Sequence, residues 1–440
     1  MGDEGGSLVE TGQVSRDAAR RGDALALTLM IFYLMSTLTL ALMAVVTPEL
    51  QRRFGLSGSQ IGLLTSAFMV AYGIVGIPAG VAAARWGGRA LAVSCAFFVL
   101  GSVLFALSSS YAGFVLGRVL QGLGGGMVVP VSAPLLAHGL APGRRNRGWG
   151  VFASGKGAGA LVALLVMPSV ATLGGFRAVF LVTAGLALVI GVAALAQHPV
   201  RALPGHPEEA TSFRALGGTL RAVAVNRCVL LLGLFNCASL AVGTGVLMWT
   251  PDFLHQTYGA SVGVAAYLTA GLAMAQLVGA PAGAAGAARL GRMPIIAGSM
   301  VVMTIACVLV PVVRGELVAF AMVVVVGFAS LAYFSPRFAM VPEVVARPEQ
   351  VGPATGFINA LGFGLSMLAP WLFGLVLDSG HGYFVGYLVL AAFGAAGALG
   401  VLAFRVPAPA TAPGPGGAPG PGLHTGPDET PAPADITREG

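Results

Sequence analysis

Charged residues are scarce in this sequence. They make up 9% of its 440 residues, whereas soluble domains carry about 25%. Hydrophobic residues account for 56% of the chain, and the mean hydropathy is +0.85. This balance excludes an ordinary soluble protein and predicts a chain that crosses a lipid bilayer many times. The net charge of +7 comes from arginines, which we expect to face anionic lipid headgroups rather than a nucleic acid.

Cysteine and histidine are also rare. The four cysteines lie in or beside apolar segments at unrelated spacings, which predicts neither disulfides nor a metal site. The six histidines form no pair with metal-ligand spacing. Residues 150–156 match G-x-x-x-x-G-K, but Gly157 stands where a phosphate-binding loop needs Ser or Thr. We therefore expect no enzyme activity and no cofactor.

Lysine occurs only once, as Lys156, inside the apolar stretch 148–167. An ammonium within a bilayer costs about 2.5–3.5 kcal/mol on insertion scales, so such a residue usually faces a wet cavity or a partner. Lys156 lies about 12 Å from the start of its helix, close to the middle of a hydrocarbon layer of about 30 Å. We therefore expect a polar cavity around it. The alternative interpretation is a lysine at a packed helix crossing that extends to one membrane surface.

Apolar segments long enough to cross a bilayer as helices follow one another along the chain. The longest internal polar connection, 198–227, divides twelve of them into two groups of six. We therefore expect an N-terminal six-helix bundle at 24–197 and a C-terminal one at 228–405. The predicted segments are 24–47, 60–83, 91–109, 112–138, 148–170, 177–197, 228–250, 263–286, 294–313, 317–336, 354–377 and 384–404.

The two groups of segments repeat each other. Thr47-Pro48-Glu49 recurs as Thr250-Pro251-Asp252, 203 residues later, and each motif is expected to end its helix. Pro78-Ala79-Gly80 recurs as Pro281-Ala282-Gly283 at the same offset. Matches in the same order along both halves indicate a duplicated six-helix unit.

Polar tails flank the two bundles. Residues 1–23 lack the pattern of a cleaved signal peptide, and 406–440 contain nine prolines and seven glycines, which predicts a disordered tail. Seventeen arginines fall on the side of the two tails and the 198–227 loop, against four on the other side. This bias predicts that both tails and the loop are cytoplasmic and that the chain spans the cell (inner) membrane.

Polar residues are concentrated in eight of the twelve segments. The third, sixth, ninth and twelfth segments hold almost none, so we expect these helices at the periphery and the other eight around a polar cavity. The same polar side chains could instead hold helices together. The candidates for contact with a ligand are Lys156, Arg118, Tyr72, Asn236, Gln276 and Asn359.

Two motifs of the first half resemble signatures of the major facilitator superfamily, and the resemblance extends over about residues 24–405. The loop signature G-x-x-x-D-R-x-G-x-R has Ala84 at its acidic position and otherwise appears as Gly80, Arg85, Gly87 and Arg89. The fourth segment carries R-x-x-Q-G-x-G as Arg118, Gln121, Gly122 and Gly124.

This resemblance implies an all-α membrane protein with twelve transmembrane helices in two pseudo-symmetric six-helix bundles. It implies a secondary transporter that works by alternating access, in which the loop motif takes part in gating and Arg118 with Gln121 in coupling. Since Ala84 replaces the carboxylate that helps to lock the cytoplasmic gate in the family, locking by that route is not expected. The Gly-Pro signature of antiporter drug exporters is poorly matched in the fifth segment, where Lys156 interrupts the region.

The charges within the segments indicate the substrate. Arg118 and Lys156 are clear cations, Arg337 is a third at the edge of a segment, and no acid lies in the middle of a segment. We therefore expect a small organic anion or an anion-bearing solute as substrate, with a proton or a counter-substrate as coupling partner and a monomer in the bilayer. One alternative is a proton-coupled exporter of a hydrophobic drug or natural product, in which Lys156 only packs. Another is a membrane sensor that transports nothing.

The outer helix ends carry two acids at equivalent positions of the repeat, Glu49 and Asp252. We expect them to belong to an outer gate, together with Arg52 or Arg53. The alternative interpretation is that both are simple solvated ends of helices.

Overall fold

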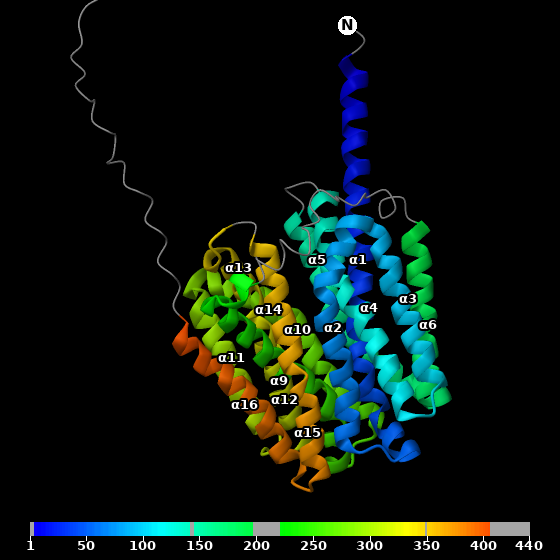
Figure 1. Cartoon of the computed structure of the whole chain (residues 1–440), viewed down its shortest axis with the longest axis vertical. Coiled ribbons are helices and arrows are strands. Elements are labelled where there is room, and N and C mark those ends of the chain that lie inside the picture. Colours follow the sequence, from blue (N-terminus) through cyan, green and yellow to red (C-terminus); the bar gives the residue numbers. More distant parts are fainter. Residues whose placement is uncertain (1–3, 141–144, 197–220, 348–349, 405–440) are drawn as a thin grey trace, which may run out of the picture. The chain divides into compact units, whose positions relative to one another are not determined.

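A computed structural model describes residues 4–140, 145–196, 221–347 and 350–404, and these residues are almost entirely helical with no strand (Figure 1). The predicted disordered tail and most of the predicted loop at 198–227 lie outside this range, so the structure does not test them. Residues Met1–Arg405 form one compact unit.

The helices of the first half correspond to the first six predicted segments. They are α1 (Glu4–Phe54), α2 (Gly58–Trp86), α3 (Ala90–Leu107), α4 (Tyr111–Gly139), α5 (Arg145–Leu165) and α6 (Met167–Ala196), with a short 3₁₀ helix η1 (Gly87–Arg89) after α2.

The second half begins with α9 (Arg227–Tyr258). It continues with α10 (Val262–Leu290), α11 (Arg292–Leu309), α12 (Glu316–Ala332), α13 (Phe334–Val344), α14 (Val351–Ser366), α15 (Leu368–Asp378) and α16 (Gly382–Ala403). In the described part of the chain, eleven helices are long and apolar enough to cross a membrane, and the shorter apolar helix Val151–Leu165 makes a twelfth span.

Prolines explain where spans are broken. The tenth span is divided at Tyr333, three residues before Pro336, and the eleventh at Met367, three residues before Pro370. A proline in a helix lacks the N–H that would bond to the preceding turn and its ring crowds that turn's carbonyl, so the helix opens there. The range of α6 includes a kink at Gly174 and Gly175, where Gly175 has φ +64°. Residues before this kink belong to the fifth span, and residues after it form the sixth.

The prediction that the first and seventh helices end at Pro48 and Pro251 is wrong. Both prolines lie inside helices, since α1 continues to Phe54 and α9 to Tyr258. One proline removes only one backbone hydrogen bond, and the bonds of the following turn continue the helix, as between the Gly55 N–H and the Gln51 carbonyl.

Glycines allow close crossings of helices in the first half. A Cβ atom at Gly159 of α5 would lie 2.2 Å from the Leu34 carbonyl oxygen of α1. At Gly122 of α4 it would lie 2.3 Å from the Phe68 carbonyl oxygen of α2. Only glycine permits backbones to approach this closely, so these glycines bring α1 onto α5 and α2 onto α4.

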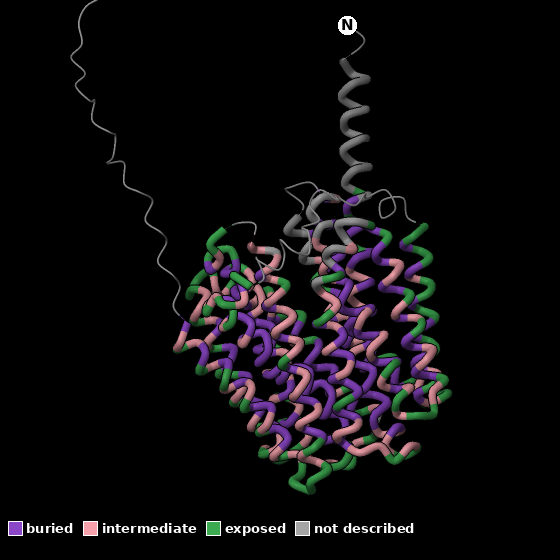
Figure 2. The backbone as a smooth tube through the Cα atoms, in the orientation of Figure 1, coloured by how far each residue is buried: buried purple, intermediate pink, exposed green. Residues whose placement is uncertain are grey.

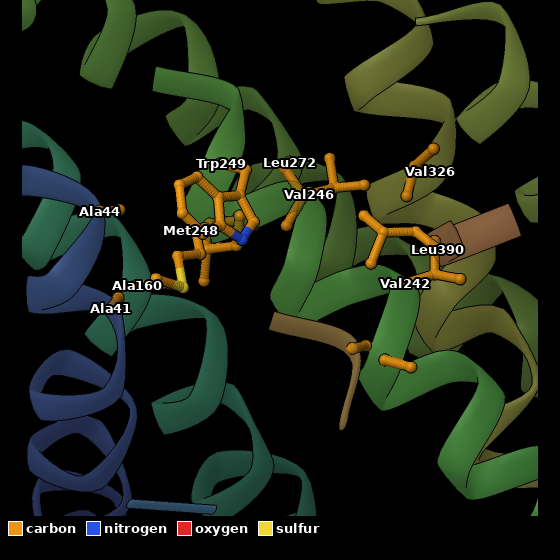
Figure 3. Close-up of a cluster of buried hydrophobic side chains, with 14 of the residues drawn as sticks. Ala41, Ala44, Ala160, Val242, Val246, Met248, Trp249, Leu272, Val326 and Leu390 are labelled. Atoms are coloured by element: carbon orange, nitrogen blue, oxygen red, sulfur yellow. The ribbon is translucent and has the colours of Figure 1, made fainter. Parts of the chain in front are cut away.

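The helix α9 is the most deeply buried span, whereas α6 presents an exposed face along its length (Figure 2). In the core, Met248 of α9 points toward Ala41 of α1 and Ala160 of α5, while Val246 points toward Leu390 of α16 (Figure 3). The two halves therefore share one apolar core around α9.

Candidate functional site

A central cavity lies between the two halves. Its volume is about 50 Å³. Because one water molecule needs roughly 10–15 Å³ of cavity volume, the cavity has room for about four. Seven spans line it, whereas α4 contributes no lining residue. The lining side chains with polar or aromatic groups are Tyr33, Ser36, Thr37, Phe68, Tyr72, Lys156, Ser239, Thr244, Gln276, Ser330 and Phe363.

Lys156 lies in the wall of this cavity and is partly buried. Its Nζ atom lies 5.8 Å from the centroid of the Phe334 ring at the start of α13. Its helix neighbour Phe152 stacks on Tyr33 of α1, with ring centroids 4.8 Å apart. Among the residues that the structure describes, no carboxylate forms an ion pair with Lys156. Among the described residues, the Phe334 ring is the aromatic group near this charge, and no side chain of opposite charge pairs with it.

Arg337 is the second cation of this region and is almost completely buried, with 1% of its surface exposed. Within the described residues, Nε, Nη1 and Nη2 all lack a hydrogen-bond partner. The guanidinium instead lies over three rings of its own segment, 4.3 Å from the centroid of Phe338, 5.5 Å from Phe334 and 5.6 Å from Tyr333. The sequence identified this residue only as a cation at the edge of a segment.

Lys156 of the first half and Arg337 of the second half both lie near the Phe334 ring. The Lys156 Nζ atom lies 5.8 Å and the Arg337 guanidinium carbon 5.5 Å from the centroid of this ring, and the distance between the two charges cannot exceed the sum of these values. Tyr33 in the cavity wall also lies within electrostatic range of Arg337. A cation of the cavity wall and a buried cation of the second half thus lie near the same aromatic ring.

Tyr72 and Gln276, two of the predicted ligand contacts, line the cavity. Tyr72 stacks on Phe363 of α14, with ring centroids 4.1 Å apart. The side-chain amide of Gln276 donates a hydrogen bond of 3.2 Å to Ser330 Oγ of α12. These contacts hold a polar wall in the second half and an aromatic bridge between the halves.

Asn236 and Asn359 do not line the cavity. Asn236 is buried in α9, where it accepts a hydrogen bond of 2.9 Å from the Tyr333 hydroxyl and donates one of 3.3 Å to the Ile358 carbonyl. It therefore joins α9 to the break between α12 and α13. Asn359 is half-buried in α14.

Arg118 also lies outside the cavity, buried within the first half. Its Nη1 atom donates to the Thr39 carbonyl (2.8 Å) and to Gln121 Oε1 (2.9 Å), and Nε donates to the Leu64 carbonyl (3.3 Å). The guanidinium lies 4.6 Å from the centroid of Phe68, whose side chain is part of the cavity wall. The structure thus places Arg118 directly behind this wall, where it connects α1, α2 and α4.

The loop motif is only partly described. Gly87 opens η1 with φ +52°, a backbone conformation that favours glycine, and Arg89 is exposed. The surroundings of Gly80 and of the Arg85 side chain lie outside the described part of the structure.

The two predicted outer acids bond within their own halves. Glu49 accepts a hydrogen bond of 2.6 Å from the Phe176 N–H and lies 3.8 Å from Arg53. Asp252 is buried and accepts a hydrogen bond of 2.5 Å from the Tyr383 hydroxyl. The alternative of a solvated helix end is therefore wrong for Asp252, because α9 continues beyond Pro251 and covers it.

Asp378, at the end of α15, connects the halves and was not singled out from the sequence. Its carboxylate accepts hydrogen bonds from the backbone N–H groups of Gly58 (2.6 Å) and Ser59 (2.8 Å) at the start of α2. A Cβ atom on Gly58 would lie 2.7 Å from the Gly374 carbonyl oxygen, so glycine permits this contact. The available signal was the Ser-Gly-Ser start of α2, which resembles a capping site but names no partner.

Comparisons with known proteins are consistent with this architecture. The fosmidomycin resistance protein of Escherichia coli (strain K12) is 25% identical over 381 residues, which are 83% of this chain and 89% of that protein. The uncharacterized MFS-type transporter YhcA of Bacillus subtilis (strain 168) is 27% identical over 135 residues, 30% of this chain and 25% of that protein. This chain thus spans only about a quarter of the length of YhcA.

A solved structure shows the same fold. The xylose transporter XylE from E. coli, in a partially occluded inward-open conformation, superposes with a TM-score of 0.70 at 17% identity. The match covers 88% of this chain and 98% of that one. This confirms the predicted all-α fold of twelve transmembrane helices in two six-helix bundles.

A family model covers most of the described chain. The model of the Major Facilitator Superfamily matches residues 25–359. The chain therefore belongs to the Major Facilitator Superfamily of transporters, and it is a multi-pass membrane protein rather than an enzyme.

Proposed function

We propose that this transporter moves a small organic anion, or a solute that carries an anionic group, by alternating access around the central cavity. The observation that carries the proposal is the buried guanidinium of Arg337, whose three nitrogens have no hydrogen-bond partner within the described structure. Lys156 adds a second cation from the opposite half.

The physical argument rests on desolvation. A buried charge is costly unless it is paired and hydrogen-bonded. Aromatic faces return about 2 kcal/mol to a desolvated cation, which leaves the directional N–H donors of Arg337 unused. A carboxylate or phosphate matches those donors in a bidentate geometry, and hydrogen bonds to charged groups contribute about 1.5–3 kcal/mol each. An anionic ligand therefore supplies the hydrogen-bond acceptors that the guanidinium of Arg337 lacks among the described residues.

The other predicted roles remain part of the proposal. Arg118 with Gln121 transmits coupling to a proton or counter-substrate through Phe68, while Gly80, Arg85, Gly87 and Arg89 act in the cytoplasmic gate and Glu49 and Asp252 at the outer end. Tyr72 and Gln276 contact substrate from the wall of the central cavity, and Asn236 and Asn359 support this wall from behind. Both tails face the cytoplasm, and the protein works as a monomer in the inner membrane.

A second candidate function is the export of a hydrophobic drug or natural product. It is supported by the aromatic residues of the cavity, Tyr33, Phe68, Tyr72 and Phe363, and by the E. coli relative named a fosmidomycin resistance protein. In that case Lys156 and Arg337 would only pack against aromatic rings.

Transport into proteoliposomes distinguishes the two candidates. Under an imposed pH gradient, we expect wild-type protein to move radiolabelled succinate or benzoate but not hydrophobic drugs such as ethidium. Arg337→Ala should abolish the anion flux, while the matched control Arg314→Ala, an exposed arginine, should keep it. Drug flux without anion flux, or full anion flux in Arg337→Ala, would contradict the proposal.

A further inference from the structure

We infer that the substrate of this site is a compact dianion, with one negative charge bound by Lys156 and the other by Arg337. The inference rests on the proposed function and names its substrate class. The shared chemistry is two negative charges a short distance apart, as in a short dicarboxylate or a phosphate monoester.

The first step is that the chain does not neutralise these cations itself. Among the described residues, no carboxylate forms an ion pair with Lys156 or Arg337, and four acids near helix ends bond elsewhere. Asp252 bonds to Tyr383, Asp378 to the start of α2, Glu49 to Phe176, and Glu343 to Arg292. Two positive charges therefore remain near the Phe334 ring.

The second step is electrostatic. In a medium of low dielectric constant, the repulsion between two cations is much stronger than in water. A monoanion would neutralise one of them and leave the other desolvated. A dianion neutralises both and replaces the repulsion between the halves with attraction, because Lys156 belongs to α5 and Arg337 to α13.

The third step concerns access to Arg337. Lys156 lines the cavity, whereas Arg337 is buried outside the cavity wall with its guanidinium 5.5 Å from the centroid of the Phe334 ring. Phe334 is the first residue of α13 and directly follows the break at Tyr333. Phe334 is only half-buried, so its ring is not enclosed on all sides. One anionic group then stays at Lys156 while the second displaces the ring and reaches the guanidinium.

The fourth step concerns size. The cavity of about 50 Å³ is far smaller than the pockets of about 300–1,000 Å³ that enclose drug-sized ligands. Ser239, Ser330 and Gln276 form a polar wall beside it. A short, polar dianion fits this combination.

The test uses purified full-length protein and two matched pairs of probes. Succinate is compared with monomethyl succinate, and methyl phosphate with dimethyl phosphate, at about pH 8, where a phosphate monoester is doubly charged. Calorimetry should show that at least one dianion binds about 10- to 100-fold more tightly than its singly charged partner, as expected for one additional charged hydrogen-bonding contact. The pair that shows this preference identifies a carboxylate or a phosphate substrate.

Variants connect that preference to the two cations. In Lys156→Ala and in Arg337→Ala, the preference for the dianion should fall to nearly one, because each variant removes one of the two charges. Arg337→Lys keeps the charge but loses the bidentate geometry, so it should keep part of the preference. The control Arg314→Ala should keep the full preference. A melting curve without ligand shows that each variant is folded, and Arg337→Lys keeps the buried charge if Arg337→Ala does not fold.

Three results would overturn the dianion inference. They are equal binding within both pairs, binding of neither dianion, and a preference that survives Lys156→Ala. Equal binding of dianions and monoanions that is lost in Arg337→Ala would leave the proposed function standing. If no anion binds and a hydrophobic drug does, the proposed function fails as well.

Discussion

At the scale of single residues, Lys156 illustrates how one charge sets the chemistry of a site. Its ammonium lies at the cavity between small neighbours, with Gly155, Gly157 and Ala160 around it on α5. Among the described residues its contact is the face of Phe334. A group that contributes little to packing and has no protein counter-charge is available to a ligand.

We predict that Lys156→Ala lowers anion affinity at least about 10-fold, the loss of one charged hydrogen bond, while the melting temperature without ligand stays the same or rises. Lys156→Arg should restore little, because the guanidinium is larger, planar and differently hydrated. The measurement is the thermal shift that succinate or methyl phosphate induces in purified protein. If Lys156→Ala keeps the full shift, Lys156 is a packing residue.

At the scale of helices, the contact between α1 and α5 positions Lys156. Gly155 and Gly159 let α5 lie directly against the backbone of α1, where Cβ atoms would come within 2.3 Å of Met30 and 2.2 Å of Leu34 carbonyl oxygens. The structure thus assigns Gly155 and Gly159 to this crossing.

We predict that Gly159→Ala forces the two helices apart and costs about 1–3 kcal/mol, as overpacking does, seen as a lower melting temperature in detergent. The matched control is Gly185→Ala on α6, where an added Cβ meets nothing within 4 Å. This control should be neutral or stabilising by about 0.5–1 kcal/mol, because alanine favours helix. Equal melting temperatures for the two variants would show that the crossing tolerates a methyl group.

At the scale of the whole transporter, Asp378 joins the two halves at one end. It bonds to the start of α2, 320 residues away in sequence, where the partial positive charge of the helix N-terminus favours a carboxylate. In addition, the Ser66 hydroxyl of α2 donates to the Met367 carbonyl between α14 and α15. Alternating access requires such contacts to form in one state and break in another.

We predict that Asp378→Asn weakens the contact between α15 and the start of α2 by about 0.5–2 kcal/mol, the usual value of a helix cap. The population should then shift toward states in which the two halves are apart at this end. Spin labels at the exposed positions Arg52 and His381 should then show a larger fraction of long distances. Glu316→Gln, which changes an acid in the first turn of α12, is the control and should leave the distribution unchanged. An unchanged distribution in Asp378→Asn would remove Asp378 from the gate.

The predicted orientation is tested by labelling intact cells. A cysteine at Ala210, in the predicted cytoplasmic loop, should resist an impermeant thiol reagent, because the membrane separates the two. A cysteine that replaces Arg314, exposed and predicted to lie outside, should react. Labelling of the Ala210 position but not the Arg314 position would invert the topology.

The sequence by itself determined the number of spans, the family and the positions of the charged residues within the spans. Hydropathy, proline and glycine act over a few residues, so they can be read locally, and they led to Lys156 and to the polar residues Tyr72 and Gln276 of the cavity wall. Local rules did not determine which buried charge faces the cavity. Only the packing of α4 against α1 and α2 places Arg118 behind Phe68, where its Nε and Nη1 donate to carbonyl oxygens and its Nη2 has no partner among the described residues.

The tertiary structure likewise determined the burial and the bonding partners of Asp252, Asp378 and Arg337. Asp252 is buried because α9 continues past its proline, and Asp378 finds its partner in the other half. Arg337 has no acceptor for its guanidinium among the described residues, and three aromatic rings lie against it instead. These outcomes depend on how helices far apart in sequence rotate and cross, and because side chains from several spans must meet at one point, no single segment contains that information.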